Sequence, residues 1–243
     1  MSKQITFVLN EKGGVGKSTL VYFYALKYHQ DPTVMFYDTD TTIAATMKQC
    51  AFLEKEGRLK KFDFLSQAGY NKSKFNELFK DIASSDKQSF FVDCGSQESK
   101  QFLLVLQDFI EVYKEFQTSG DYGIRFLVPI GNNGIVFSGT IDFVKSLMLS
   151  TEYSFPVYLM INIGLFNSAS SDGLDAQYAV IEELKNDFSK ILKVQEYGKL
   201  YPVESTDKHI LDGAGEGLTL DQYDIFCRGK IRNRIFPEGN ILF

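Results

Sequence analysis

The segment that most constrains the fold of this chain is a glycine-rich turn near its beginning, Glu11–Thr19, which reads Glu-Lys-Gly-Gly-Val-Gly-Lys-Ser-Thr. The run before it, Ile5–Leu9, is apolar and typical of a buried strand. Apolar residues at helical spacing follow the turn over residues 17–28. Glycines between a strand and a helix let backbone N–H groups converge on an anion. The sequence therefore predicts a phosphate-binding loop.

The side chains of this turn suit a nucleotide bound together with a metal ion. Lys17 can reach the β- and γ-phosphates of a nucleotide, and the Ser18 hydroxyl can ligate Mg²⁺. The helix that begins here directs the positive end of its dipole at the same phosphates. We expect the phosphates to be bound by Gly13, Gly14, Val15, Gly16, Lys17, Ser18 and Thr19.

Strand and helix patterns alternate along the chain, which predicts an α/β fold with a mostly parallel sheet and helices on both faces. The expected strands cover residues 5–9, 34–37, 89–92, 124–129, 157–163 and 194–200. The expected helices cover residues 17–28, 74–83, 100–115, 135–149, 175–190 and 219–228. No linker rich in Pro, Gly or Ser divides the chain, so we expect a single domain over residues 1–243.

Composition narrows the class of protein. A net charge of −5 argues against a protein that coats nucleic acid with its whole surface. The three cysteines are widely spaced without metal-ligand spacing, and His29 and His209 stand alone, so both histidines are expected to be structural. With no apolar run of membrane-spanning length and no signal peptide at the start, we expect a cytoplasmic protein that does not bind membranes.

Two departures from the general P-loop pattern point to a narrower group. Glu11 stands where the first glycine is usual, and Lys12 is an additional lysine. The resulting Lys-Gly-Gly-x-Gly-Lys-Ser resembles the deviant Walker A box of the ParA/MinD superfamily of dimerising ATPases. The resemblance implies a P-loop NTPase fold, ATP and Mg²⁺ as ligands, and a homodimer with ATP. In that dimer Lys17 acts within its own subunit, and Lys12 contacts the nucleotide of the partner subunit.

Aspartates follow two of the predicted strands, at the edge where ligands collect in a parallel sheet. Asp38 and Asp40 follow the second strand, and the resemblance implies that Asp40 positions the attacking water while Asp38 lies nearer Mg²⁺. Here Thr41-Thr42 replaces the Pro-Gln that the family has after this aspartate. Asp93 follows the third strand and resembles the Walker B carboxylate that holds a Mg²⁺-bound water.

Later segments carry weaker signals. Asn162 resembles the strand-end asparagine that hydrogen-bonds adenine, although such a residue can also cap a turn. Pro202 corresponds to a loop that packs on the base. The densest basic cluster in the chain can bind DNA phosphates without sequence preference, or it can be a solvated surface. It consists of Arg228, Lys230, Arg232 and Arg234.

The resemblance implies a slow ATPase that drives plasmid or DNA partition with an adaptor, such as a centromere-binding protein. A TraL-type accessory ATPase of conjugative transfer, working with a relaxosome protein, is the alternative, because segments 91–96 and 217–221 look similar to it. An ATP-dependent metabolic ligase and a nucleotide-binding scaffold that no longer hydrolyses are further alternatives with the same loop.

Overall fold

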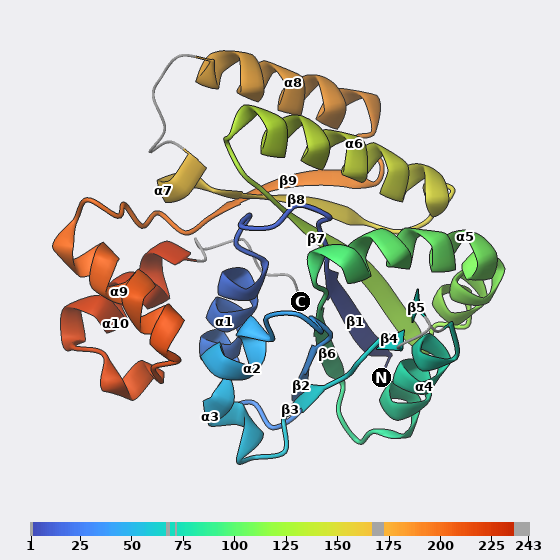
Figure 1. Ribbon diagram of the computed structural model, residues 1–243, viewed down its shortest axis with the longest axis horizontal. Coiled ribbons are helices and arrows are strands. Elements are labelled where there is room, and N and C mark those ends of the chain that lie inside the picture. Colours follow the sequence, from blue (N-terminus) through green and yellow to red (C-terminus); the bar gives the residue numbers. More distant parts are fainter. Residues whose placement is uncertain (1, 67–68, 71, 167–172, 236–243) are drawn as a thin grey trace.

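The strands form one seven-stranded parallel sheet in the order β3-β2-β6-β1-β7-β8-β9. The computed structural model describes residues 2–66, 69–70, 72–166 and 173–235 (Figure 1). The strands of this sheet are β1 (Lys3–Val8), β2 (Val34–Asp38), β3 (Leu59–Lys61), β6 (Ser89–Asp93), β7 (Tyr122–Ile130), β8 (Val157–Asn162) and β9 (Leu192–Tyr197). A short antiparallel pair, β4 (Leu65–Ser66) and β5 (Gly69–Tyr70), is separate from it.

The predicted phosphate-binding loop lies at the carboxyl end of the central strand β1. Helix α1 (Lys17–Lys27) leads from this loop to β2, and β6 lies between β1 and β2 in the sheet. The next neighbour of β1, on its other side, is β7. The chain thus runs from β1 to β2 on one side and from β6 to β7 on the other side of β1, and this reversal of strand order is the switch point where such sheets bind ligands.

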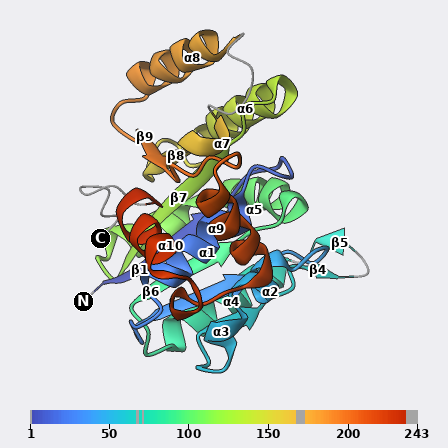
Figure 2. The same cartoon turned by 90° about the vertical axis from the view of Figure 1, so that its left-hand side faces the viewer.

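Helices cover both faces of the sheet, as the alternating pattern predicts (Figures 1 and 2). Successive strand residues point to opposite faces, so Phe7 and Phe126 join one apolar cluster while Val8 and Leu127 join the other. The first cluster is closed by α4 (Lys72–Ser84), α5 (Ser96–Thr118), α6 (Gly134–Ser150) and α8 (Leu174–Asp187). The second is closed by α1, α2 (Ala45–Gln49), α3 (Ala51–Glu54), α9 (Ser205–Glu216) and α10 (Ile225–Lys230).

The last third of the chain differs most from the sequence-based expectation. Helix α9 is absent from the helices predicted from the sequence. Gly213 is required there by packing: a Cβ at this position would lie 2.4 Å from the Tyr223 hydroxyl. The single helix expected over 219–228 is instead a 3₁₀ turn, Leu220–Gln222, followed by α10 and a π-helical turn, Ile231–Ile235.

Other boundaries shift modestly. The last strand ends at Tyr197 rather than 200, and α5 begins at Ser96, four residues before the predicted helix. A short helix, α7 (Ile163–Phe166), follows β8 directly. Over the ranges that the structure describes, none of the helices combines the length and the apolar character needed to cross a membrane.

Candidate nucleotide-binding site

The loop between β1 and α1 has the backbone conformation that its glycines predict. Gly14 and Gly16 have φ angles of 72° and 86°, in the left-handed region that favours glycine. The buried Asn10 anchors the loop: its Nδ2 donates to the Pro129 carbonyl and to Thr140 Oγ1, both at 2.8 Å, and its Oδ1 accepts from Lys12 N–H. Asn10 was not singled out in the sequence, because its partners lie about 120 residues away along the chain.

The Lys17 side chain lies folded into the loop. Its ammonium group donates to the carbonyls of Asn10 (3.0 Å) and Lys12 (3.1 Å) and to Ser96 Oγ (3.2 Å). Burial lowers the pKa of Lys17, and the nearby carboxylates, Asp93 first among them, oppose that shift. Phosphate oxygens can replace these neutral acceptors, since an ammonium group bonds more strongly to an anion.

Ser18, in the first turn of α1, contacts Asp93 at the end of β6. A magnesium site at this loop requires such a contact. Ser18 Oγ donates to Asp93 Oδ2 at 2.8 Å, and Thr46 Oγ1 donates to the same oxygen at 2.5 Å. The other oxygen, Oδ1, is buried and has no hydrogen-bond partner among the described residues. A free carboxylate oxygen beside a hydroxyl suits a hard cation that prefers oxygen ligands, so the residues present fit Mg²⁺.

The burial of Asp93 predicts that the stability of the protein without nucleotide depends on pH. Burial raises the pKa of Asp93 to about 7, although Thr46 and Ser18 donate to its carboxylate. The folded state then holds a proton that the unfolded chain releases near pH 4, so Asp93 lowers the unfolding free energy as the pH rises from about 4 to 7. Over this pH range the unfolding free energy falls by on the order of 4 kcal/mol, because one pKa unit corresponds to about 1.4 kcal/mol.

Asp93→Asn should remove this dependence, because an amide does not titrate. Urea unfolding between pH 4 and 8, in EDTA and without nucleotide, measures it for both proteins. We expect the variant to gain stability relative to the natural chain as the pH rises. A difference between the two that stays constant with pH would contradict the assignment.

Asp38 and Asp40 organise the loop after β2. Asp38 is fully buried, and its two oxygens accept the backbone N–H groups of Asp40 (2.9 Å) and Met47 (2.8 Å). Asp40 Oδ1 accepts from the N–H groups of Thr42 (2.8 Å) and Ile43 (3.0 Å). Both aspartates therefore hold the loop in shape, and their roles toward metal and water stay predictions.

Glu98 is a further carboxylate at the site, and the sequence analysis missed it. It is 1% exposed and accepts from Thr41 Oγ1 at 2.6 Å. A Cβ on Gly95 would lie 2.2 Å from Glu98 Oε2 and 3.0 Å from Asp40 Cγ, so these two carboxylates flank the same glycine. The Thr41 that departs from the family pattern thus has a specific partner. Glu98 was missed because it lies before the residue where the helix was expected to begin.

Thr41→Val should destabilise the protein by about 1–3 kcal/mol, since Glu98 would remain buried without its hydroxyl donor. Thr41→Ser keeps the donor and should recover most of the loss. The unfolding free energies of the two variants in urea measure the effect. Equal stability of the valine and serine variants would show that the hydrogen bond contributes nothing.

The residues expected near the base lie on the other side of the loop. Asn162, at the end of β8, is buried and hydrogen-bonded to the Tyr197 hydroxyl. That hydroxyl lies 3.7 Å from where a Cβ on Gly16 would be, so Tyr197 links Asn162 to the phosphate loop. Pro202 lies in the half-buried loop between β9 and α9. Contact of Asn162 and Pro202 with a base stays a prediction.

Lys12 lies along α6 rather than over its own loop. Its ammonium pairs with Glu11 at 3.2 Å, and both side chains are about one-third exposed. A Cβ on Gly139 would lie 2.0 Å from Lys12 Cε, so the small residue makes room for the lysine. A partly exposed ion pair of this kind is weak, and Lys12 can exchange it for another anion.

The basic cluster at the C-terminal side is partly neutralised within the chain. Lys230 pairs with Asp207 at 2.6 Å and with Glu204 at 3.0 Å. Arg228 is half-buried and Arg232 is exposed, while the side chain of Arg234 lies outside the described residues. The cluster therefore offers fewer free cations than the sequence suggests.

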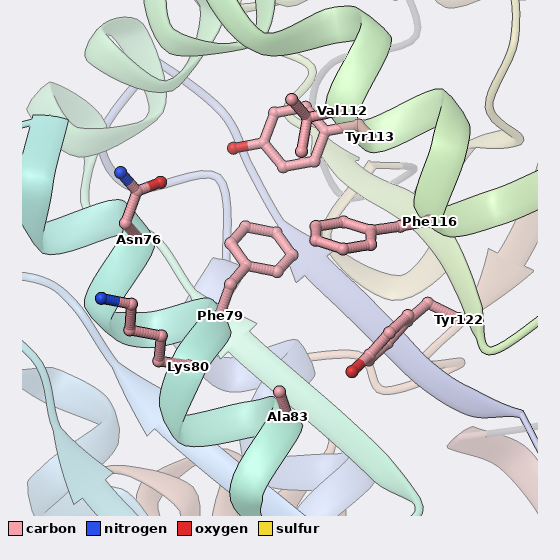
Figure 3. Close-up of a pocket in the computed structure, with 8 residues that line it drawn as sticks. All are labelled: Asn76, Phe79, Lys80, Ala83, Val112, Tyr113, Phe116 and Tyr122. Atoms are coloured by element: carbon pink, nitrogen blue, oxygen red, sulfur yellow. The ribbon is translucent and has the colours of Figure 1, made fainter. Parts of the chain in front are cut away.

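A separate cavity of about 290 Å³ lies between α4 and α5, and Figure 3 shows the rings of Phe79, Phe116 and Tyr122 turned toward it. Tyr122 begins β7, so the cavity lies toward the amino ends of the strands, whereas the phosphate loop follows the carboxyl end of β1. Half of the residues that line it are aromatic. The cavity is thus distinct from the nucleotide site.

The fold is similar to those of solved P-loop proteins. No family model and no curated protein matches the sequence. A plasmid partition protein from Borrelia burgdorferi aligns over 89% of this chain and 97% of its own, with 14% identity and a TM-score of 0.51. The MinD cell division protein of Aquifex aeolicus aligns over 94% and 93%, with 14% identity and a TM-score of 0.53. This chain therefore has the same α/β fold as these two proteins.

Proposed function

We propose that this chain is an ATPase of the ParA/MinD type, which binds ATP with Mg²⁺ at residues 11–19. The observation that carries the proposal is the hydrogen bond from Ser18 to Asp93, whose other carboxylate oxygen is buried without a partner. Ser18 and Asp93 would hold the ion, and Asp38 lies close by in the sheet, paired with Asp93. The contribution of Mg²⁺, when bound, is to neutralise charge on the β- and γ-phosphates.

Hydrolysis follows from the residues around the γ-phosphate position. Lys17 would exchange its carbonyl acceptors for phosphate oxygens and stabilise the charge that develops during phosphoryl transfer. Asp40 would orient the attacking water and accept its proton. The turn at Gly95, between the Asp40 and Glu98 carboxylates, would respond to the presence of the γ-phosphate.

ATP would join two copies of the chain face to face. Lys12 of each copy would leave its weak pair with Glu11 and contact the phosphates bound by the other. Ile43 and Ile135 are 75% and 80% exposed, and they follow β2 and β7, on the same edge of the sheet as the loop. A second copy that covers this edge would bury both side chains, which favours association.

The ATP-bound dimer would bind DNA or an adaptor, such as a centromere-binding or relaxosome protein, and partition of a plasmid or other DNA in the cytoplasm would be its output. Arg228 and Arg232 would supply DNA contacts. Phosphate release stimulated by DNA or by a protein partner, without a small-molecule acceptor, is the expected behaviour. Release that requires a small acceptor would indicate a ligase instead, and no release at all would indicate a scaffold.

Lys12→Ala tests the dimer directly. We expect the variant to bind ATP as a monomer and to lose roughly 2–5 kcal/mol of ATP-dependent association, because a buried charge contact would be missing. Sedimentation velocity with ATP and with ADP measures this. Glu11→Gln is the matched control, since it removes the pair within the chain and keeps the lysine. A Lys12→Ala protein that dimerises and hydrolyses normally would refute the role of Lys12.

A further inference from the structure

Three side chains of metal-ligating type meet where α9 lies beside α10 (Figure 1). His209 comes from α9, Asp224 precedes α10, and Cys227 lies in the first turn of α10. One candidate ligand atom from each lies within 4.8 Å of the other two. Imidazole, carboxylate and thiolate together are the ligand types of zinc sites in proteins.

The Asp224 and Cys227 side chains are held in place by the start of α10. Asp224 Oδ1 accepts the backbone N–H groups of Phe226 and Cys227, each at 2.8 Å. Asp224 Oδ2 points to the thiol, 3.4 Å from Cys227 Sγ. Cys227 itself is 1% exposed. One carboxylate oxygen thus fixes the orientation of the group, and the other accepts a hydrogen bond from the thiol.

The His209 ring is oriented by a buried tyrosine. It packs edge-on against Tyr223, with ring centroids 5.9 Å apart. The Tyr223 hydroxyl donates to the Ile210 carbonyl at 3.1 Å and lies 2.8 Å from the Tyr22 hydroxyl. Because Tyr223 is itself held by these hydrogen bonds, its ring limits the orientations open to His209.

We propose that His209, Asp224 and Cys227 form a Zn²⁺ site that joins α9 to α10. Zinc bonds of about 2.0–2.3 Å place tetrahedral ligand atoms roughly 3.3–3.8 Å apart. The sulfur is buried, and Asp224 Oδ2 already lies at such a distance from it, so only the exposed His209 ring has to move closer. The Cys227 thiol gives its proton to solvent as the sulfur–zinc bond forms. A water molecule would take the fourth position on the exposed side.

Bound zinc would hold α9 and α10 together, directly after the loop that contains Pro202. The pair of Lys230 with Asp207 already joins α10 to the beginning of α9. A zinc ion would add a second, stronger connection beside it. This proposal does not rest on ATP binding, so it can hold or fail independently of the proposed function.

The test uses the full chain, freed of any histidine tag and stripped with EDTA. Co²⁺ titration should produce a thiolate-to-cobalt charge-transfer band, and dialysis against Zn²⁺ should leave one equivalent of zinc by elemental analysis. Zinc should also raise the melting temperature, because it binds the folded state. His209→Gln and Asp224→Asn should each weaken binding roughly tenfold or more, and Cys227→Ser should abolish the charge-transfer band.

Matched controls come from the same chain. His29→Gln alters the other histidine, and Cys50→Ser alters another buried cysteine. Both should bind zinc as the natural chain does. Asp224→Asn keeps an oxygen that can cap α10, so weak binding by this variant would not reflect a lost helix cap. Absence of the charge-transfer band in the natural chain, or equal zinc binding by His209→Gln, would overturn the proposal.

Discussion

Asp40→Ala is expected to slow phosphate release by roughly 10²–10⁴-fold, the usual contribution of a positioned general base. The variant should still bind ATP, because the phosphate loop and its lysine are unchanged. Since closure precedes hydrolysis in the proposed cycle, ATP-bound dimers should accumulate. Steady-state phosphate release and sedimentation with ATP measure the two effects on the same sample.

A second variant, Asp40→Asn, distinguishes the catalytic role of Asp40 from its contacts within the loop. Asp40 Oδ1 also accepts the backbone N–H groups of Thr42 and Ile43, so alanine would remove a loop contact together with the carboxylate. Asp40→Asn keeps an oxygen for those N–H groups but is a far weaker base. Slow hydrolysis by both variants would support the catalytic role. Normal hydrolysis by Asp40→Asn would mean that Asp40 only shapes the loop.

Lys17→Ala is expected to weaken ATP binding by about 10²–10⁴-fold. The ammonium would make two charge-assisted hydrogen bonds to phosphate oxygens, each contributing about 1.5–3 kcal/mol. The loss should be smaller for AMP, which lacks the β- and γ-phosphates. Titration with a fluorescent ATP analogue, with ATP and AMP as competitors, measures the affinities.

The folded state itself should tolerate this change. Lys17 is buried in the nucleotide-free protein and its pKa is lowered, so alanine relieves a desolvation cost while it leaves three acceptors without this donor. Lys12→Ala is the matched control for affinity, because a lysine that acts across a dimer should not affect binding by the monomer. Equal ATP affinity of Lys17→Ala and the natural chain would exclude the loop as the phosphate site.

The parts of the site that could be predicted from the sequence depend on contacts between near neighbours. The loop lies between an apolar run and a helical pattern within about 25 residues. The strand and the helix that flank it could therefore be predicted from nearby residues alone. The three aspartates were found because each ends or follows a strand of a parallel sheet, and the carboxyl ends of such strands share one edge. Lengths of elements were less certain, as the early start of α5 at Ser96 shows.

Residues that depend on distant partners were missed. Asn10 holds the phosphate loop through Pro129 and Thr140, and nothing in its local sequence distinguishes it from a turn residue. Helix α9 was not predicted; it contains Gly213, an unfavourable residue in a helix, and this glycine leaves room for the Tyr223 side chain. In both cases tertiary packing overrides the local preference of the residue.

By itself, the sequence determined a glycine-rich turn between a strand and a helix, and a set of carboxylates at the same edge of a parallel sheet, because backbone geometry and strand direction are encoded locally. Only the tertiary structure decided which partner each charged or reactive side chain has. Folding pairs Glu98 with Thr41 and Lys230 with Asp207, and it brings His209 near Asp224 and Cys227. Most of these partners are far apart along the chain, and burial makes their pairing specific, since an unpaired polar group in the interior is costly.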